Sequence, residues 1–548
     1  MADADVLIVG AGPVGLALAV QCARYGVQAK VIDKRAGPAE ESRALTLWSS
    51  ALEAMESMGC AGQVIATAYE VRQIKISAEK AVLAEIDVAH EVESRYPLPM
   101  LLPQFETERI FLERLQELGG DVEWGVELVS FEEVDDVVVS HVLSKDGAVE
   151  TVRTRWLAGA DGAHSTVRHV AGIDFLGEAV EETFALADVE IDQELDEETI
   201  HVDWSRKGVL AMFPVQPGLW RIVANRRDDD RGGEPPTLEE VNAIFADHGH
   251  KTWKSSNPEW LAAFRVSERQ ATEFRRGRVM LLGDAAHVHS PAGGQGMNTG
   301  IQDAFNLGWK LGVLKAGRGD ENALLESYGT ERSAVAEEVL RAAALQAKMS
   351  LVKNPLAQMA LNTGFRIMAQ TEGFKADFAD ELSGLGTVYA ESPVIGNDEA
   401  WHEDWRSKGF GPGMRVRSAD VHCPRREAKI SLLDEMAGDG HAILLFSGRK
   451  ARTEDREAVE AFEVRFREIA GDAEKFVRVW RGSRLPKGAK ESEWMLDDSS
   501  EAHLRYGVEL PAAYVVRPDG FVAFRCSPLD AEMMASYADL VIGKTKRV

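Results

Sequence analysis

Three separated segments of the chain combine glycine with polar side chains in a pattern suited to binding a phosphate-containing ligand. The first is Gly10-Ala11-Gly12-Pro13-Val14-Gly15. In such a segment the first glycine permits a tight turn, the second lets a pyrophosphate approach the backbone, and the third lets a helix pack closely on a strand. Asp33 follows 18 residues after Gly15, where a carboxylate can bind both hydroxyls of an adenosine ribose. The pattern predicts a dinucleotide site that includes the neighbouring Lys34.

The other two segments each follow an apolar run. Residues 157–168 end one strand with Asp161-Gly162 and begin a helix, and Gly283-Asp284 ends another strand and leads into residues 291–298, which contain three glycines. Asp284 at a strand end can accept charge-assisted hydrogen bonds from ribityl hydroxyls, which nicotinamide dinucleotides lack. Backbone N–H groups at the start of the helix that follows would favour negative charge on a reduced ring. The sequence therefore favours a flavin.

In order and in residue identity, these three segments resemble the class A FAD-dependent aromatic hydroxylases, the para-hydroxybenzoate hydroxylase-like family. The resemblance covers about residues 1–395 and, more weakly, the tail. It implies an α/β fold with an α+β insert, in which residues 1–175 and 276–395 form a Rossmann-like FAD-binding domain. Residues 176–275, with parts of 70–105, would form an inserted antiparallel-sheet substrate domain.

The resemblance also implies particular FAD contacts. Asp161 would lie beside the pyrophosphate, Arg43 near the phosphates, Gln104 against the cofactor and the backbone amide of Val126 at the adenine. Asp303, Asn306 and Leu307 would fix the loop and its helix. The whole implied FAD-binding set is Gly10, Gly12, Pro13, Val14, Gly15, Asp33, Lys34, Arg43, Gln104, Val126, Asp161, Gly283, Asp284, Pro291, Gly293, Gly294, Gln295, Gly296, Met297 and Asn298.

The activity implied by the resemblance is NAD(P)H-dependent hydroxylation of a phenolic or polycyclic aromatic ring by dioxygen, through a C4a-hydroperoxyflavin on noncovalent FAD. The cofactor carries this chemistry, so no protein nucleophile is expected and the catalytic residues are not identified. A flavin epoxidase, a Baeyer–Villiger-type oxygenase and a non-catalytic flavin-binding protein are the alternatives. Five residues are candidates for the substrate pocket, although each could equally belong to the core: Trp48, Tyr96, Phe213, Trp220 and Pro291.

Hydrophobic patterning predicts the elements that position these residues. Residues 5–9 and 29–32 are apolar runs typical of buried strands, and a helix of small apolar residues lies between them and ends near Tyr25. An amphipathic helix is predicted for residues 105–118, and helices dominate residues 297–381. Strands are predicted at 121–131, 137–143, 155–158, 209–215, 219–224 and 278–282, with turns at 216–218 and 232–233.

The tail is expected to form a separate domain over residues 410–548, after a linker near residues 394–412. Its strand and helix pattern, with Tyr506-Gly507 and residues 514–525, resembles the thioredoxin-like C-terminal domain of the phenol hydroxylase and polyketide hydroxylase branches. Cys423 and Cys526 each stand alone, so dithiol chemistry is excluded and a structural or dimer-related role is expected.

Composition limits the other functional classes. The chain has 548 residues, of which 45% are hydrophobic and 28% charged, and its net charge is −27. Such a globular, acidic chain repels nucleic acid and anionic membranes at long range. The four cysteines form no C-x-x-C pair, and no metal ligand set is evident. The uncharged stretch at residues 6–23 is broken by glycine and preceded by acidic residues, unlike a signal peptide, so a cytoplasmic protein is expected, with a homodimer possible.

Overall fold

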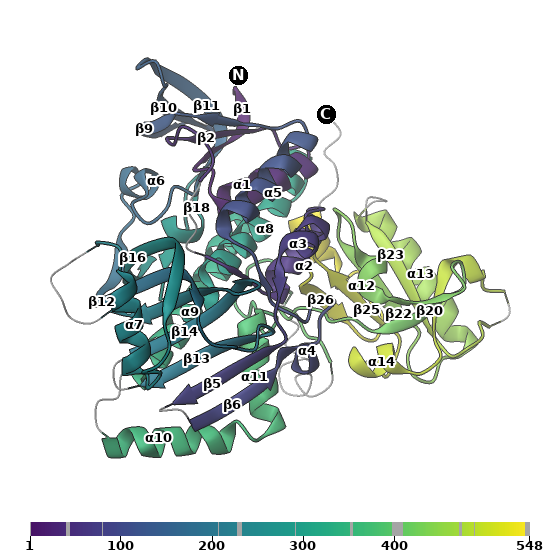
Figure 1. Ribbon diagram of the computed structural model, residues 1–548. Helices are drawn as coiled ribbons and strands as arrows, with labels where there is room; N and C mark the ends of the chain where they lie inside the picture. Colours follow the sequence, from purple (N-terminus) through teal and green to yellow (C-terminus); the bar gives the residue numbers. More distant parts are fainter. Residues whose placement is uncertain are drawn as a thin grey trace. The chain divides into compact units, whose positions relative to one another are not determined.

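The computed structural model describes residues 2–39, 44–78, 81–205, 208–226, 233–290, 292–350, 355–396, 409–470, 474–486 and 488–542 (Figure 1). The chain divides into two compact units, and the helices α1, α8 and α9 contribute residues to both. Unit 1 comprises Met1–Ala17, Lys30–Asp303 and Val335–Leu385, and unit 2 comprises Leu18–Ala29, Ala304–Ala334 and Gly386–Val548.

Unit 1 contains a mainly parallel sheet whose strands run in the order β17-β18-β11-β1-β2-β8. The four buried residues of β1 are all apolar, as expected for a strand covered on both faces. The helix α1 begins at Pro13. Proline suits the first helical turn because it lacks an N–H group, and an N–H group at that position would have no acceptor within the helix. The elements are β1 (Ala4–Val9), α1 (Pro13–Arg24), β2 (Ala29–Asp33), β8 (Val122–Trp124), β9 (Glu127–Val134), β10 (Val137–Leu143), β11 (Val149–Gly159), β17 (Arg275–Arg276) and β18 (Val279–Leu281).

The second sheet of unit 1 has eight strands in the order β19-β16-β12-β15-β14-β13-β5-β6. All its pairs are antiparallel except β13 with β5, which run parallel. One face is covered by α7 (Leu238–Asp247), and residues of α10 and α11 pack on the other. The strands are β5 (Gln73–Ala78), β6 (Ala81–Asp87), β12 (Phe175–Ile191), β13 (Thr199–Ser205), β14 (Gly208–Gln216), β15 (Leu219–Asn225), β16 (Ser255–Ala271) and β19 (His287–Val288).

The remaining elements of unit 1 are a three-stranded sheet and the helices around it. The order of the small sheet is β3-β7-β4. The elements are β3 (Thr46–Leu47), β4 (Tyr69–Glu70), β7 (Met100–Leu101), α2 (Ser49–Ser57), α3 (Ala61–Thr67), α4 (Val88–Glu91), α5 (Gln104–Glu117), α6 (Thr166–Val170), α10 (Pro355–Met368), α11 (Glu372–Ser383) and two 3-10 turns at Gly283–Ala285 and Ala292–Gly294. The helices shared with unit 2 are α8 (Gly296–Lys315) and α9 (Glu321–Ser350).

Unit 2 contains a seven-stranded mixed sheet in the order β21-β20-β24-β23-β22-β25-β26. Its central strands β22 and β25 are buried at every position, and they enclose a core with Phe446, Tyr506 and Tyr514. The elements are β20 (Asp420–Cys423), β21 (Ala428–Ser431), α12 (Leu432–Met436), β22 (Ala442–Phe446), α13 (Thr453–Ala470), β23 (Lys475–Arg481), β24 (Trp494–Asp497), α14 (Glu501–Arg505), β25 (Ala512–Val516), β26 (Val522–Cys526), α15 (Ala535–Tyr537), a 3-10 turn at Glu491–Glu493 and a π-helical turn at Ala538–Ile542.

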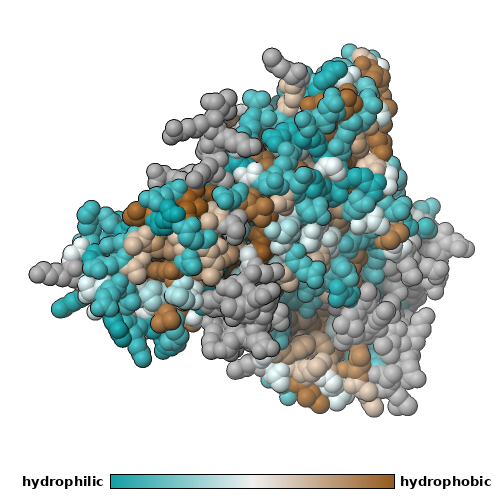
Figure 2. Space-filling view, turned by 180° about the vertical axis from the view of Figure 1, so that it is seen from behind, coloured by the Kyte–Doolittle hydropathy of each residue, from teal (hydrophilic) through white to brown (hydrophobic). Residues whose placement is uncertain are grey.

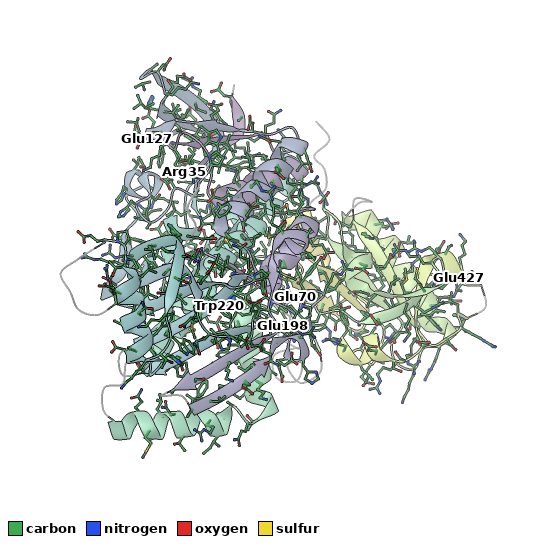
Figure 3. The ribbon with its side chains drawn as sticks, viewed as in Figure 1. Arg35, Glu70, Glu127, Glu198, Trp220 and Glu427 are labelled. Atoms are coloured by element: carbon green, nitrogen blue, oxygen red, sulfur yellow. The ribbon has the colours of Figure 1, made fainter. Side chains whose placement is uncertain are left out.

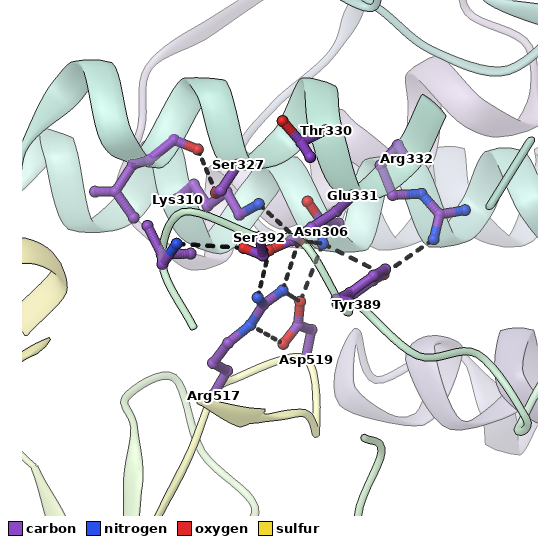
Figure 4. A network of polar contacts seen from close by, with 12 residues as sticks. Asn306, Lys310, Ser327, Thr330, Glu331, Arg332, Tyr389, Ser392, Arg517 and Asp519 are labelled. Atoms are coloured by element: carbon purple, nitrogen blue, oxygen red, sulfur yellow. Dashed lines mark hydrogen bonds and ion pairs between the residues drawn. The ribbon is translucent and has the colours of Figure 1, made fainter. Parts of the chain in front are cut away.

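A buried polar network lies in the interior of unit 2 (Figure 4). Each of the three guanidinium nitrogens of Arg517 donates to a carboxylate, with Nε 2.9 Å from Asp519 Oδ1 and Nη1 2.6 Å from Glu331 Oε1. Lys310 Nζ lies 2.9 Å from Glu331 Oε2. Burial alone would raise the pKa of Glu331, but the positive charges of Arg517 and Lys310 outweigh this effect and hold the pKa well below its ordinary value. The charges of Arg517 and Lys310 are therefore balanced by Glu331 and Asp519, and the guanidinium group of Arg517 is saturated with carboxylate acceptors.

Most of the predicted elements are present in the structure, and the main differences are as follows. The predicted strand over residues 121–131 is two strands, β8 and β9, because Gly125 between them has a φ of +75°. Helix α7 was not predicted, although Thr237 caps it by accepting a hydrogen bond from Glu240 N. The inserted sheet is not wholly antiparallel, since β5 joins it in parallel with β13. The predicted turn at residues 232–233 falls partly, and the predicted linker at 394–412 mostly, outside the described residues.

The surface is hydrophilic over most of the face seen in Figure 2, and hydrophobic side chains there form small groups. This agrees with the strongly negative net charge of −27. No helix in the described part of the chain is long and apolar enough to cross a membrane.

Candidate active site

In the glycine segment between β1 and α1, neighbouring atoms leave no room for a side chain at two of the three glycines, and they leave room at the third. Gly10 has a φ of +102°, and a Cβ there would lie 2.3 Å from the carbonyl oxygen of Ala160. A Cβ at Gly15 would lie 1.9 Å from the carbonyl oxygen of Gly10. A Cβ at Gly12 would meet no described atom within 4 Å. The fold itself requires glycine at the first and third positions, and Gly12 is where an outside group could approach the backbone.

The end of β2 carries a polar cluster around Asp33. Asp33 Oδ2 accepts a hydrogen bond from Ala11 N at 2.8 Å, and Oδ1 accepts one from Arg35 N at 2.8 Å. The Arg35 guanidinium also donates to Ala11 O and pairs with buried Glu108 at 3.3 Å. Burial lowers the pKa of Arg35, but the two carboxylates raise it above its ordinary value. The Arg35 guanidinium also donates to both oxygens of Asp33, so this carboxylate already accepts four hydrogen bonds, which is about its full capacity. A ribose hydroxyl would have to take the place of one of the guanidinium bonds; Lys34 is exposed beside Asp33.

Gln104 connects this cluster to the chain near residue 44. Its Oε1 accepts from Ala44 N at 3.4 Å, and its Nε2 donates to Glu108 Oε1 at 3.0 Å. Val126 N donates to Asp33 O at 3.0 Å, so the N–H that the sequence placed at the adenine already has an acceptor within the protein. Arg43 lies outside the described residues.

The turn after β18 exposes Asp284 while its neighbours are buried. Gly283 N donates to Asp303 Oδ2 at 3.0 Å, and His287 Nε2 lies 2.8 Å from the same oxygen. A Cβ at Gly283 would meet the side chain of Val14 at 2.9 Å. Val14 and Asp303 therefore hold the turn in place, as predicted for Asp303, and Asp284 is the side chain that the turn presents outward.

The loop before α8 is fixed by side-chain hydrogen bonds. Gly293 and Gly294 have φ angles of +78° and +63°, which only glycine adopts readily. Asn298 accepts from Trp48 N at 2.8 Å and donates to Thr46 O and Gly294 O, each at 2.8 Å. Gln295 Nε2 donates to Leu382 O at 2.6 Å. The side chains of Gln295 and Asn298 build the loop, so any ligand contact there would use backbone N–H groups of Gly296 and Met297, which open α8.

His289 adds an acceptor beside this loop. Its Nδ1 lies 2.8 Å from Ser290 O, so that nitrogen carries the proton, and burial lowers the pKa of the ring to about 4. Nε2 is buried and has no hydrogen-bond partner among the described residues. It lies 3.7 Å from the position that a Cβ of Gly296 would occupy. At neutral pH the ring presents a lone pair toward the loop, and the sequence alone did not single out this role.

Asp161 caps α6 instead of standing open. Its carboxylate accepts from Ser165 Oγ at 2.5 Å and from Thr166 N at 2.7 Å. Burial raises its pKa, although these hydrogen bonds act in the opposite direction. Arg168 in the same helix donates to Ala285 O at 2.8 Å. The segment therefore links α6 to the turn that carries Asp284.

The predicted pocket residues do not gather at one place. Trp48 is 3% exposed, and its Nε1 donates to Gly293 O at 2.9 Å, so it holds the loop. The Tyr96 side chain forms hydrogen bonds with Glu56 and Arg95, and burial raises the pKa of its hydroxyl to about 12. Phe213 packs toward α10 and α11. Trp220, which is labelled in Figure 3, packs in the core cluster that contains residues of α7. Neighbouring strand residues face opposite sides, and Phe213 pairs with Arg221, so the prediction that Phe213 and Trp220 line one pocket is wrong. Pro291 lies outside the described residues.

Comparison with known proteins decides the family. The family model described as "FAD binding domain" matches residues 3–343. The chain belongs to this family. It is 32% identical over 531 residues to 6-methylpretetramide 4-monooxygenase of Streptomyces rimosus, which covers 95% of this chain and 90% of that protein.

Two further FAD-family relatives match over nearly their whole length. Pentachlorophenol 4-monooxygenase of Sphingobium chlorophenolicum is 29% identical over 558 residues, covering 99% of this chain and 97% of that one. A solved structure of aklavinone-11 hydroxylase, a ternary complex with FAD and aklavinone, matches with a TM-score of 0.77 at 25% identity, over 99% of this chain and 100% of that chain. The present chain is a flavoprotein monooxygenase with the aromatic-hydroxylase fold.

The residues present fit FAD on three independent observations. The gap at Gly12 admits a pyrophosphate against the backbone. Asp284 is an exposed carboxylate on a fixed turn, as a polyhydroxyl chain requires. His289 Nε2 is a buried lone pair without a donor among the described residues, and an isoalloxazine ring carries N–H groups.

Proposed function

We propose that the protein hydroxylates a phenolic or polycyclic aromatic substrate, with FAD as cofactor, dioxygen as co-substrate and NADH or NADPH as reductant. The single observation that carries the proposal is the whole-length relationship to 6-methylpretetramide 4-monooxygenase, which spans 95% of this chain. Relatives with related activities by name include pentachlorophenol 4-monooxygenase. A flavin-dependent epoxidase or Baeyer–Villiger-type oxygenase is the nearest alternative.

Bound FAD supplies the redox chemistry that lets dioxygen attack an electron-rich ring. The residues of the chain bind and orient it. Backbone N–H groups at the start of α1 and the open position at Gly12 would hold the pyrophosphate, since a helix N-terminus favours anions. Asp33 would bind the adenosine ribose and Asp284 the ribityl chain. Both assignments give a carboxylate to hydroxyl groups, which is the stronger, charge-assisted kind of hydrogen bond.

The loop at Gly293–Asn298 would face the ring of the cofactor. Its backbone shape is set by two left-handed glycines and by the Asn298 and Trp48 hydrogen bonds, so the N–H groups that open α8 are held in place. The positive end of this helix favours a reduced, anionic ring. His289 Nε2 would accept a ring N–H, since its pKa of about 4 keeps the side chain neutral at physiological pH.

We further propose that the C-terminal region, residues 410–548, is a thioredoxin-like domain without dithiol chemistry. Cys423 and Cys526 are buried and form no disulfide, and Cys526 Sγ lies 3.4 Å from the sulfur of Met534. A buried lone thiol among apolar side chains is unreactive. The domain boundaries, a homodimer and a cytoplasmic location stay predictions from the sequence.

The test of the proposed function is product formation by the FAD-loaded protein. We expect one or more members of a panel of phenols and hydroxylated polycyclic aromatics to stimulate NADH or NADPH oxidation under air. The expected product carries one more hydroxyl group than the substrate, as shown by mass spectrometry and NMR. An epoxide or a ring-expanded ester would identify the alternative oxygenases. Absence of both oxidation and product with every panel member would favour a non-catalytic flavin-binding protein.

A further inference from the structure

One row of side chains crosses the large sheet of unit 1 on the face opposite α7. Phe213 on β14 pairs with Arg221 on β15, Arg221 pairs with Asp188 on β12, and Asp188 pairs with Trp260 on β16. Directly paired residues of neighbouring strands point to the same face of a sheet. The row therefore places an ion pair between two aromatic side chains.

The ion pair is buried and has bidentate geometry. Arg221 Nε lies 2.8 Å from Asp188 Oδ1, and Nη2 lies 2.7 Å from Asp188 Oδ2. The two side chains are 3% and 10% exposed, and the guanidinium lies 5.3 Å from the centre of the Trp260 ring. Two nitrogens on one edge of the planar group thus face Asp188, which directs Nη1 away from it.

Arg221 Nη1 is buried and has no hydrogen-bond partner among the described residues. A buried donor without a partner costs roughly 1–3 kcal/mol, and more for a charged group. Such a cost at the centre of a stable sheet indicates a position that another molecule completes. The sequence contains no signal for this, because Asp188 and Arg221 are 33 residues apart.

Most of the side chains around the pair are apolar and only partly buried, whereas Leu186, which precedes Asp188 on the same face of β12, is 1% exposed. These side chains lie on one face of the four adjacent strands β14, β15, β12 and β16. Phe184 and Phe264 stack on this face, with ring centres 5.7 Å apart. A flat apolar ring could therefore lie on this face without removing charge from water. The partly exposed members are Phe184, Ala211, Phe213, Val223, Trp260 and Phe264.

We propose that Arg221 anchors the aromatic substrate by donating a hydrogen bond from Nη1 to a phenol or carbonyl oxygen of the ring. The proposal rests on the proposed function and adds the group that positions the substrate. Asp188 balances the charge of Arg221, so the pair as a whole is neutral. A neutral pair with one spare donor suits an uncharged or weakly acidic oxygen better than a carboxylate, which would bring an unbalanced charge into an apolar site.

Arg226 offers a matched control one residue beyond the same strand. It is also buried and forms a bidentate pair, with Nε and Nη2 lying 2.6 and 3.0 Å from the Glu240 carboxylate. Its Nη1, however, donates to Glu234 O at 2.7 Å. Each of its three nitrogens is engaged, so Arg226 has the same chemistry as Arg221 without the spare donor.

The experiment measures equilibrium binding of 2-naphthol and naphthalene to the full-length, FAD-loaded protein by calorimetry, without reductant. Wild-type protein should bind 2-naphthol more tightly than naphthalene. Arg221→Met should weaken 2-naphthol binding about 10- to 100-fold, the loss of one hydrogen bond from a charged donor, and change naphthalene binding less than about twofold. Arg226→Met should leave the ratio of the two affinities as in wild type.

A double variant guards against loss of folding. Arg221→Met with Asp188→Leu removes both charges and leaves side chains of similar volume, a change that buried pairs often tolerate, and it should show the same loss of 2-naphthol binding. Unchanged 2-naphthol affinity in both variants, equal losses for the two probes, or a wild-type protein that does not prefer 2-naphthol would overturn the proposal. Failure of the panel to give any oxygenated product would instead overturn the proposed function, because this binding measurement needs no turnover.

Discussion

Two buried arginines in this protein, Arg221 in unit 1 and Arg517 in unit 2, both pair with carboxylates. They differ in how many of their guanidinium nitrogens have a hydrogen-bond acceptor. All three guanidinium nitrogens of Arg517 donate to Glu331 or Asp519. Arg221 donates to Asp188 through two nitrogens and leaves Nη1 without a partner among the described residues. A saturated network stabilises the fold, and an unsaturated one stays available to a ligand.

The glycines of the first segment divide in the same way. The positions of Gly10 and Gly15 are filled by neighbouring backbone, and that of Gly12 is open. Arg517, Gly10 and Gly15 make contacts that the fold itself requires. Arg221 has a spare hydrogen-bond donor and Gly12 has free space beside it, so both can contact a molecule that the chain does not supply. Residues that hold the fold are therefore distinct from residues that hold a ligand. Substitutions of the first kind should lower stability, and substitutions of the second kind should weaken binding.

Breaking the saturated network should have the largest effect. Arg517→Met leaves two buried carboxylates without their main partner, and we expect it to lower the free energy of unfolding by about 3–5 kcal/mol. Urea denaturation followed by circular dichroism measures this. Arg341→Met, which removes an exposed pair with Glu337, should change it by less than about 0.5 kcal/mol. Similar small effects in both variants would contradict a stabilising role for the network.

The glycine pair should separate folding from cofactor binding. Gly15→Ala places a Cβ 1.9 Å from the Gly10 carbonyl oxygen, so we expect little folded protein. Gly12→Ala meets no described atom within 4 Å and should fold normally, with an unfolding temperature of the FAD-free protein close to that of wild type. Its FAD affinity, measured by fluorescence titration, should fall by at least about tenfold, since a methyl group would occupy the place of a pyrophosphate. Unchanged FAD affinity would remove Gly12 from the site.

The saturated network should also make stability depend on pH. The pKa of Glu331 is below its ordinary value of 4.5 in the folded protein, so the folded state binds this proton less tightly than the unfolded chain. Its stabilising contribution is complete well above pH 4.5 and is lost as the pH falls. The stability difference between wild type and Glu331→Gln should therefore shrink as the pH falls. Thermal unfolding at a series of pH values tests this, and a difference that grows in acid would contradict it.

The smallest effect is expected from Trp220. It packs on the α7 side of the sheet, away from the face that carries Arg221. Trp220→Phe should cost a few kcal/mol at most by leaving a gap in the core, and it should leave the affinity for 2-naphthol within about twofold of wild type. Phe213→Ala, on the other face, should weaken binding of both 2-naphthol and naphthalene. Equal effects of the two substitutions on binding would remove the distinction between the faces.

Local patterns in the sequence predicted the elements that surround the candidate site. The glycine segment, α1 and the Asp284 turn depend on residues close together in the chain, so spacing alone located them. Pairs formed across long separations were not predictable: Arg35 with Glu108, 73 residues apart, and Arg221 with Asp188. The position of Trp220 was misjudged because the face of a strand residue depends on register, which a one-residue shift reverses.

The most direct test of the account is the origin of the oxygen in the product. FAD-loaded protein would be supplied with NADH or NADPH, a stimulating phenol and isotopically labelled dioxygen, and the product analysed by mass spectrometry. We expect a hydroxylated ring that carries one labelled oxygen atom. Reductant consumption that yields only hydrogen peroxide with every stimulating phenol, or a hydroxyl group without label, would contradict it.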